Sequence, residues 1–209
     1  MNYLAHLALS GDEPDVLIGN FMGDFIKGQL THNRFTSLPV GIQKGILLHR
    51  KIDNFTDTHP FVSEVAAYFA PSQGKFASIV TDVLFDYLLA NHWDKLYTRS
   101  VDLDTFAENI YTILPKYTSF YPERMEKVVQ SLLLHKWLPQ YKSEEGIQMA
   151  LAGISRRLTL KPSFESVFSV FRANEQEITS LFLCYYPQLQ EFCTEYLMNE
   201  FIPYESKNT

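Results

Sequence analysis

Cysteine and long apolar runs are scarce in this sequence of 209 residues. The only two cysteines, Cys184 and Cys193, are spaced like neither a zinc knuckle nor the framework of a disulfide-rich secreted domain. No uncharged apolar run approaches the length of a membrane span, and no basic segment precedes the short apolar stretch near Met1. We therefore expect free thiols, a cytoplasmic location and no membrane anchor.

Basic residues are also too few for one broad class of function. The chain has 18 lysines and arginines against 24 acids, which gives a formal net charge of -6. General nucleic-acid binders owe most of their affinity to basic side chains on phosphates, so this composition argues against a nucleic-acid partner. An anionic substrate must meet a local basic patch, and the oligomeric state stays open.

Strand-like alternation with hairpin turns is absent, and apolar residues recur at helical spacing almost throughout. There is no repeat or low-complexity linker, so we predict one all-α domain, a helical bundle over residues 1–209. Thr58 is a candidate cap before Pro60. The main helices are expected over 15–28, 39–54, 58–70, 74–97, 163–186 and 188–201, with several more between residues 103 and 158.

Polar residues with a spacing of four interrupt two apolar helices. His49 and Asp53 share one helix face, and Asp82 and Asp86 share another. Asp24 interrupts a third apolar stretch. Buried carboxylates are costly unless they are paired or bound to a metal, so a shared divalent cation would stabilise all of them. Mixed imidazole and carboxylate ligands suit manganese, magnesium, iron or zinc, and the oxygen-rich balance favours the first two.

Simpler interpretations exist for each of these residues. His49 and Asp53 could form an ordinary helix hydrogen bond, and Asp24 could be exposed or a cap. The repulsion between Asp82 and Asp86 needs a positive partner, which could be an arginine (Arg50, Arg156 or Arg157) instead of a metal. His6 lies in an apolar run and is interpreted as a core histidine, and His59 and Asp57 could cap a helix.

Five blocks of the sequence together resemble a known family. They are MNYLAHLALS, IGNFMGDFIKG, GIQKGILLHRKIDNFTDTHP, TDVLFDYLLANHW and GISRRL, and they span Met1 to about Leu158. In this combination they are similar to the acyl carrier protein phosphodiesterases. Between Arg99 and Ser143 the likeness is mostly helical pattern.

The resemblance implies an HD-domain-like helical fold, manganese as the ion, and holo-acyl carrier protein as an acidic protein substrate. The reaction would hydrolyse the phosphodiester between 4'-phosphopantetheine and a serine. The usual HD pattern has a histidine, then an adjacent His-Asp pair, then a later aspartate. Here Arg50 follows His49, the acid is displaced to Asp53, and Asp24 stands where an early histidine is expected.

On this basis we assign roles to the candidate residues. The metal ligands would be Asp24, His49, Asp53, Asp82 and Asp86. Arg50 and Arg157 would bind phosphate oxygens, and His59 would protonate the leaving serine oxygen. Carrier-protein docking would use basic residues around the site: Lys27, Lys44, Arg50, Lys51 and Arg156. The alternatives are an HD-like phosphohydrolase acting on a small phosphoester or nucleotide, and a non-catalytic helical binding protein.

Overall fold

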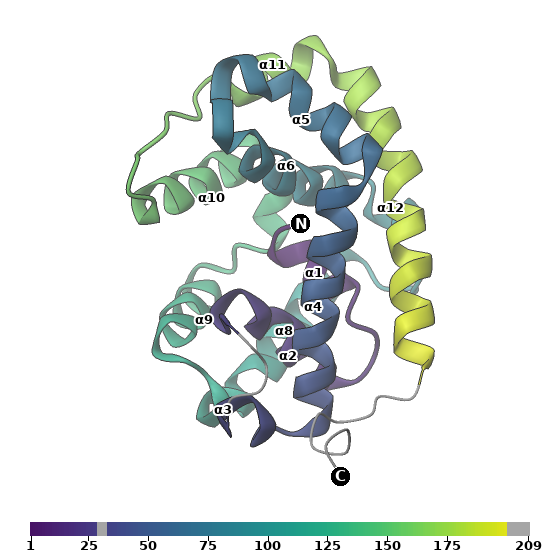
Figure 1. Cartoon of the computed structure of the whole chain (residues 1–209), viewed down its shortest axis with the longest axis vertical. Helices are drawn as coiled ribbons and strands as arrows, with labels where there is room; N and C mark the ends of the chain where they lie inside the picture. Colours follow the sequence, from purple (N-terminus) through teal and green to yellow (C-terminus); the bar gives the residue numbers. More distant parts are fainter. Residues whose placement is uncertain (29–32, 200–209) are drawn as a thin grey trace.

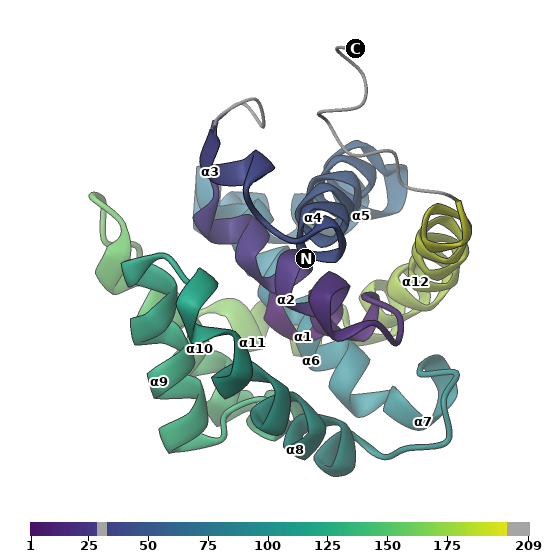
Figure 2. The ribbon, with the colours of Figure 1, turned by 90° about the horizontal axis from the view of Figure 1, so that it is seen from below.

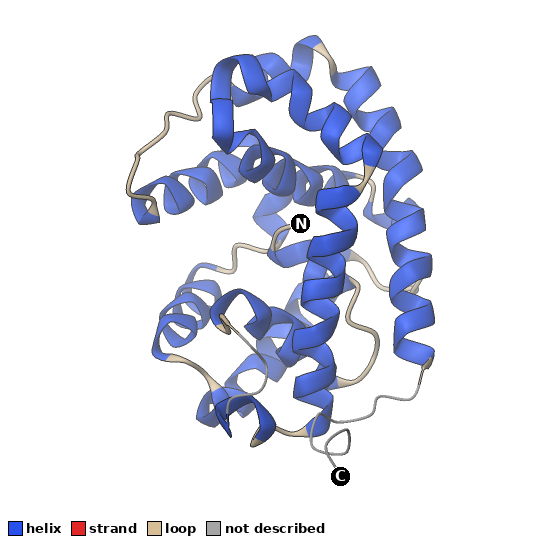
Figure 3. Cartoon of the chain, viewed as in Figure 1, coloured by secondary structure: helices blue, strands red, loops and turns tan. Residues whose placement is uncertain are grey.

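The computed structural model describes residues 1–28 and 33–199, and helices fill most of this part of the chain (Figure 3). The described residues contain no strand, which confirms the all-α prediction. One hydrophobic cluster runs through all the larger helices. The α-helices are α1 (Tyr3–Ala8), α2 (Pro14–Met22), α3 (Asn33–Thr36), α4 (Val40–Thr58), α5 (Pro60–Gln73), α6 (Ala77–Asn91), α7 (Trp93–Leu96), α8 (Leu103–Ile113), α9 (Glu123–His135), α10 (Glu144–Arg157), α11 (Val167–Ala173) and α12 (Glu175–Met198), with short 3-10 helices η1 (Gly23–Phe25), η2 (Gly74–Phe76), η3 (Leu114–Phe120) and η4 (Pro139–Lys142).

Helix α4 runs through the middle of the molecule with α12 along one side (Figure 1). Helix α2 packs against α4 at very short range because glycines face each other across the contact. A Cβ atom on Gly19 would lie 2.1 Å from the Ile42 carbonyl oxygen, and one on Gly45 would lie 2.1 Å from that of Val16. Only glycine permits this backbone approach. The polar residues that end α2 are thereby brought against the middle of α4.

Helix α1 is short and contacts both α2 and α6 (Figure 2). Its side chains are almost all buried, which accounts for the apolar run at the start of the sequence. The histidine of this helix, His6, is buried as well, with 2% of its surface exposed. Helix α1 therefore carries a histidine into the interior beside α4.

Several predicted helix ends were wrong, by one to six residues. Helix α2 ends at Met22 and is followed by η1, so the helix does not continue to Gly28. Helix α4 continues past Asn54 to Thr58. The N-cap of α5 is His59, whose ring nitrogen accepts a hydrogen bond from the backbone of the first turn, and not the predicted Thr58.

The C-terminal helices also differ from the prediction. The expected break at Pro187 is absent, and α12 continues through this proline because its buried face, including Tyr186 and Leu189, continues on both sides. The break falls instead at Asn174, between α11 and α12. The predicted helix 74–97 is divided near His92 into α6 and α7. Residues 200 and 201 of the last predicted helix, and residues 29–32, lie outside the described part of the chain.

Across residues 1–28 and 33–199, no helix combines the length and the hydropathy that a membrane span requires.

Candidate metal centre

Four polar side chains meet where α1, η1 and α4 come together: His6, Asp24, His49 and Asp53. The Nε2 atom of His6 lies 3.2 Å from Asp53 Oδ1, and the Nε2 atom of His49 lies 3.2 Å from Asp53 Oδ2. Asp24 lies 3.6 Å from His49 Nε2, and the two imidazole rings stack with their centroids 4.0 Å apart. One ligand atom each from His6, His49 and Asp53 lie within 4.8 Å of one another. A single cation can therefore contact all three.

The two kinds of ligand differ in their exposure. His6 and His49 are buried, whereas the side chains of Asp53 and Asp24 are 43% and 47% exposed. The carboxylates thus form the solvent side of the cluster, and the imidazoles form its floor. A substrate oxygen can approach from the carboxylate side without displacing any of the core.

Hydrogen bonds fix the orientation and the proton position of His6. The Asn20 side-chain amide donates to the His6 carbonyl oxygen and to Ser10 Oγ, at 2.8 and 3.0 Å. The Asn20 oxygen therefore faces His6 Nδ1, at 2.9 Å, and Nδ1 carries the proton. In the neutral imidazole, Nε2 is left with its lone pair toward Asp53.

That lone pair is the observation that fits a cation. His6 Nε2 is buried, makes no hydrogen bond, and faces a carboxylate oxygen 3.2 Å away. Two acceptors at this distance repel each other unless a proton or a metal lies between them. A histidine whose other nitrogen donates to a protein oxygen is the usual arrangement of a metal ligand. The donor set present here, two imidazoles and one or two carboxylates, fits a divalent transition metal.

The electrostatics of the cluster keep both acids ionised and, without a metal, keep His49 protonated at neutral pH, so a cation that His49 ligates must displace this proton. Burial lowers the pKa of His6, and the neighbouring His49 lowers it further. Burial also disfavours charge on His49, but hydrogen bonding to Asp24 and Asp53 more than offsets this and raises its pKa to about 9. The pKa values of both carboxyl groups lie below their usual range, because the imidazoles outweigh the effect of burial. Both acids are therefore ionised and available as ligands at neutral pH.

A glycine makes room for the His49 ring. A Cβ atom on Gly23 would lie 2.1 Å from His49 Cγ. The 3-10 turn that begins at this glycine then places Asp24 against the same imidazole. The block GNFMGD thus contributes two close-approach glycines, Gly19 and Gly23, and one carboxylate.

Asp82 and Asp86 on α6 have other partners. Asp82 accepts a hydrogen bond from the Met1 amino group at 2.8 Å. Asp86 is fully buried, and its two oxygens accept from the backbone N–H groups of Leu4 and Ala5 at 2.8 and 3.2 Å. The positive partner expected between these acids is thus the start of α1 and not an arginine. Their role as metal ligands stays a prediction.

The three predicted catalytic residues are occupied elsewhere. Arg50 donates to the carbonyl oxygens of Ile26 and Gly28 and so holds the segment after Asp24 against α4. Arg157 is exposed on α10, where its Nε atom donates to the Gly153 carbonyl oxygen. The Nδ1 atom of His59 accepts from the backbone of α5, which is the capping alternative. Their catalytic roles stay predictions.

Sequence reasoning missed the contribution of His6. Its surroundings in the sequence are those of an ordinary core histidine, and it is buried like one. The available signal was a second buried polar residue, Asn20, in an equally apolar stretch. Buried polar groups need partners, so two of them in otherwise apolar segments suggest that they bind each other.

Comparisons with known proteins agree with the resemblance of the sequence blocks. A family model described as acyl carrier protein phosphodiesterase matches residues 1–189. The chain belongs to this family. Acyl carrier protein phosphodiesterases of Yersinia pestis and Klebsiella pneumoniae (strain 342) are 31% and 32% identical to the chain, and each alignment covers 90% of this chain and 95% of the relative. The protein of that name from Escherichia coli O6:H1 is 31% identical, with 91% and 96% covered.

The match to the acyl carrier protein phosphodiesterase family includes every residue of the cluster. No solved structure matches the chain. The predicted HD-domain likeness therefore stays a prediction.

Proposed function

We propose that this protein is a metal-dependent phosphodiesterase that releases 4'-phosphopantetheine from the serine of holo-acyl carrier protein. Family membership supports the substrate, because relatives aligned over nine-tenths of the chain are named acyl carrier protein phosphodiesterases. The observation that carries the metal is the unpartnered His6 nitrogen facing Asp53. The unpaired cysteines are compatible with a reducing compartment, so the proposal retains a cytoplasmic location.

His6, His49 and Asp53 would hold the ion, with Asp24 beside them. Manganese suits this mixture of nitrogen and oxygen ligands, and magnesium and iron(II) are the alternatives. When bound, such an ion makes water acidic enough to attack at neutral pH and draws charge from a phosphoryl oxygen. The other groups keep the ligands in place: Asn20 orients His6, and Arg50 fixes the segment after Asp24.

Docking of an acidic carrier protein needs basic side chains near the cluster. Of the five predicted, Lys44 donates to the carbonyl oxygens of Leu197 and Asn199, and Arg50 binds the segment after Asp24. The exposed Lys27, Lys51 and Arg156 remain for docking. Because exposed charges are screened by salt, association with the carrier protein is expected to weaken as ionic strength rises.

The test is incubation of manganese-loaded protein with holo-acyl carrier protein, followed by mass spectrometry of the carrier protein. Wild type is expected to remove 4'-phosphopantetheine, so the carrier protein loses the mass of this group. Chelation should abolish this activity, and added manganese should restore it. His49→Ala and Asp24→Ala should lower the rate about a thousandfold, which corresponds to ~4 kcal/mol of barrier. Asn54→Ala, an exposed change on the same helix, is the matched control.

Two results would overturn parts of the proposal. If folded, metal-loaded protein leaves holo-acyl carrier protein intact but hydrolyses small phosphoesters, the carrier-protein assignment is wrong. If the protein binds no metal and its melting temperature does not respond to a chelator, the cluster is a set of ion pairs and the protein is a helical binding protein.

A further inference from the structure

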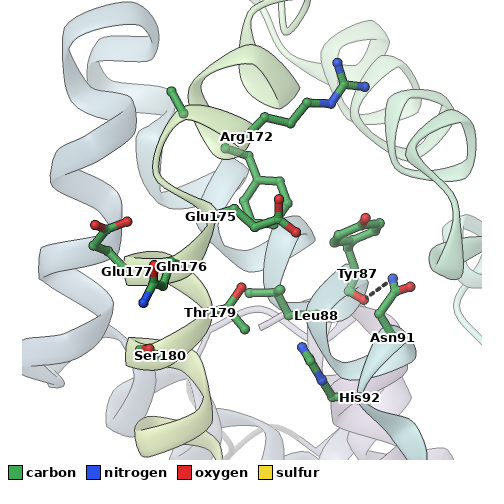
Figure 4. Close-up of a pocket in the computed structure, with 12 residues that line it drawn as sticks. Tyr87, Leu88, Asn91, His92, Arg172, Glu175, Gln176, Glu177, Thr179 and Ser180 are labelled. Atoms are coloured by element: carbon green, nitrogen blue, oxygen red, sulfur yellow. Dashed lines mark hydrogen bonds between the residues drawn. The ribbon is translucent and has the colours of Figure 1, made fainter.

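Among the described residues, two hollows outside the metal cluster differ in the charges that line them. One, of about 800 Å³, lies between the end of α6 and the α11–α12 junction (Figure 4). It has charges of both signs around it, including Arg172, Glu175 and Glu177, and Arg172 is itself paired with Glu144. The other, of about 440 Å³, lies between α9 and α10 and is called here the α9–α10 cleft. Three cations, Lys127, Arg156 and Arg157, line it, and no carboxylate does.

A cleft free of acids is unusual in a chain with a net charge of -6. Lys127 is paired with Glu123 at 2.8 Å, whereas Arg156 and Arg157 form no ion pair with any described residue. Both arginines are exposed at the end of α10. This end of the cleft can therefore attract an anion, and guanidinium groups are well suited to phosphate oxygens.

The rest of the cleft has aromatic, apolar and amide-binding side chains, which suit an uncharged, partly apolar chain. Trp137 contacts the rings of Tyr3 and Tyr141, with centroids 5.6 and 5.8 Å away, and these aromatics form one wall. Met149, 57% exposed, contributes apolar surface from α10. Side chains that can hydrogen-bond an amide also line it: Asn2, Ser131 and Gln140. A volume of this size suits a small-molecule ligand.

Tyr3 connects this cleft to the metal cluster. Its ring lies against Trp137 on one side and Phe21 on the other, and it precedes His6 by one turn of α1. Its hydroxyl is influenced by groups on both sides. Burial raises the pKa of Tyr3, the Asp24 carboxylate raises it further, and a hydrogen bond and the charge of Arg157 lower it. The arginine end of the cleft and the carboxylates of the cluster therefore both act at this residue.

We infer that the α9–α10 cleft binds the pantetheine arm of the substrate, with the phosphate toward Arg156 and Arg157 and the amide-containing arm along the Trp137 wall. This inference rests on the proposed function and adds where the arm lies. It places the arm near α1, α9 and α10. The aromatic-rich C-terminal helices, an alternative location for such a channel, use Phe182, Tyr185 and Tyr186 as core.

Binding of the reaction product tests the inference without turnover. In a Trp93→Phe background, Trp137 is the only tryptophan and reports occupancy of the cleft by fluorescence. Manganese-loaded protein is titrated with 4'-phosphopantetheine and, separately, with inorganic phosphate. 4'-Phosphopantetheine is expected to bind at least about tenfold more tightly, because phosphate can occupy only the arginine end of the cleft and lacks the arm that contacts the Trp137 wall.

A blocking variant removes that difference. Gly153 on α10 lines the cleft, and a Cβ atom there would have only the flexible Arg156 side chain within 4 Å. Gly153→Leu therefore fills the cleft without a backbone clash. It should lower the affinity for 4'-phosphopantetheine about tenfold more than the affinity for phosphate, because the flexible Arg156 side chain can move aside and still reach a phosphate. Ala152→Leu, an exposed change on the same helix, is the matched control. If Gly153→Leu does not fold, Met149→Phe at an exposed cleft position replaces it and keeps Trp137 as the only tryptophan.

The outcomes separate this inference from the proposed function. Equal affinity for phosphate and 4'-phosphopantetheine, or unchanged 4'-phosphopantetheine binding in a folded blocking variant, overturns the cleft assignment. If the difference is seen but wild type does not act on holo-acyl carrier protein, the proposed function fails while the binding site stands. A raised KM for holo-acyl carrier protein in Gly153→Leu, with kcat little changed, supports both.

Discussion

Helices α4 and α6 carry polar pairs with the same spacing but opposite outcomes. On α6, Asp82 binds the Met1 amino group and Asp86 binds two backbone N–H groups, so each carboxylate has a partner within the protein. On α4, His49 and Asp53 lie beside His6, whose buried Nε2 has no hydrogen-bond partner. Spacing of four residues shows that two side chains share a helix face. Whether their charges are satisfied depends on the elements packed against that face.

Asp86 on α6 should make the stability of the protein depend strongly on pH. Burial raises the pKa of Asp86 to about 7, against an unfolded value near 3.8, although backbone hydrogen bonds partly oppose the shift. Between these values the folded protein holds a proton that the unfolded chain has lost. The free energy of unfolding should therefore fall as the pH rises from about 4 to 7, by up to ~4 kcal/mol from this group.

Asp86→Asn isolates this term, since an amide cannot ionise. Denaturant unfolding of chelated wild type and variant across this pH range gives the difference between them. The variant should gain stability relative to wild type as the pH rises. Parallel curves would show that Asp86 ionises normally despite its burial.

Much of the fold was accessible from the sequence, because apolar periodicity is local. The helical class and the middle of α4 follow from residues such as Ile46 and Ile52, which are fully buried as their spacing predicts. The ends were less accessible, because they depend on tertiary contacts. Helix α12 continues through Pro187, since its buried face compensates for one lost hydrogen bond.

Spacing along one helix predicted two members of the candidate cluster, and Asp24 was named because it interrupts an apolar stretch. His49 and Asp53 are four apart, so their common face followed from the sequence. The approach of His6 depends on α1 packing beside α4, and no local pattern encodes that contact. The same applies to the Met1 amino group and the Leu4 N–H group, which bind the α6 acids.

A second prediction concerns the packing of the His49 ring of α4 against Gly23. Gly23→Ala places a methyl group about where the His49 ring carbons lie. The ring must shift away from Asp24 and Asp53, and we expect a loss of about 2 kcal/mol in the free energy of unfolding together with weaker manganese binding. Gly153→Ala, where a Cβ atom meets only the end of the Arg156 side chain at 3.7 Å, should instead be stabilising by roughly 0.5–1 kcal/mol. Thermal unfolding and metal titration of both variants provide the check. A Gly23→Ala protein that binds manganese normally would show that the position of the His49 ring does not depend on Gly23.

Asn20 lies behind the α4 cluster, so a change there leaves all the proposed ligands in place. Asn20→Leu removes the acceptor for His6 Nδ1–H and frees the ring to turn or to change tautomer. Loss of such an orienting hydrogen bond typically costs a metal site about tenfold or more in affinity. Asn20→Asp keeps an acceptor at this position and should retain more of the affinity. Leucine would also disturb folding if Asn20 were only a core residue, so manganese affinity is measured beside the unfolding free energy. Equal losses of affinity in both variants would mean that Asn20 does not orient His6, and the α4 cluster would then be no more organised for a cation than the acid pair on α6.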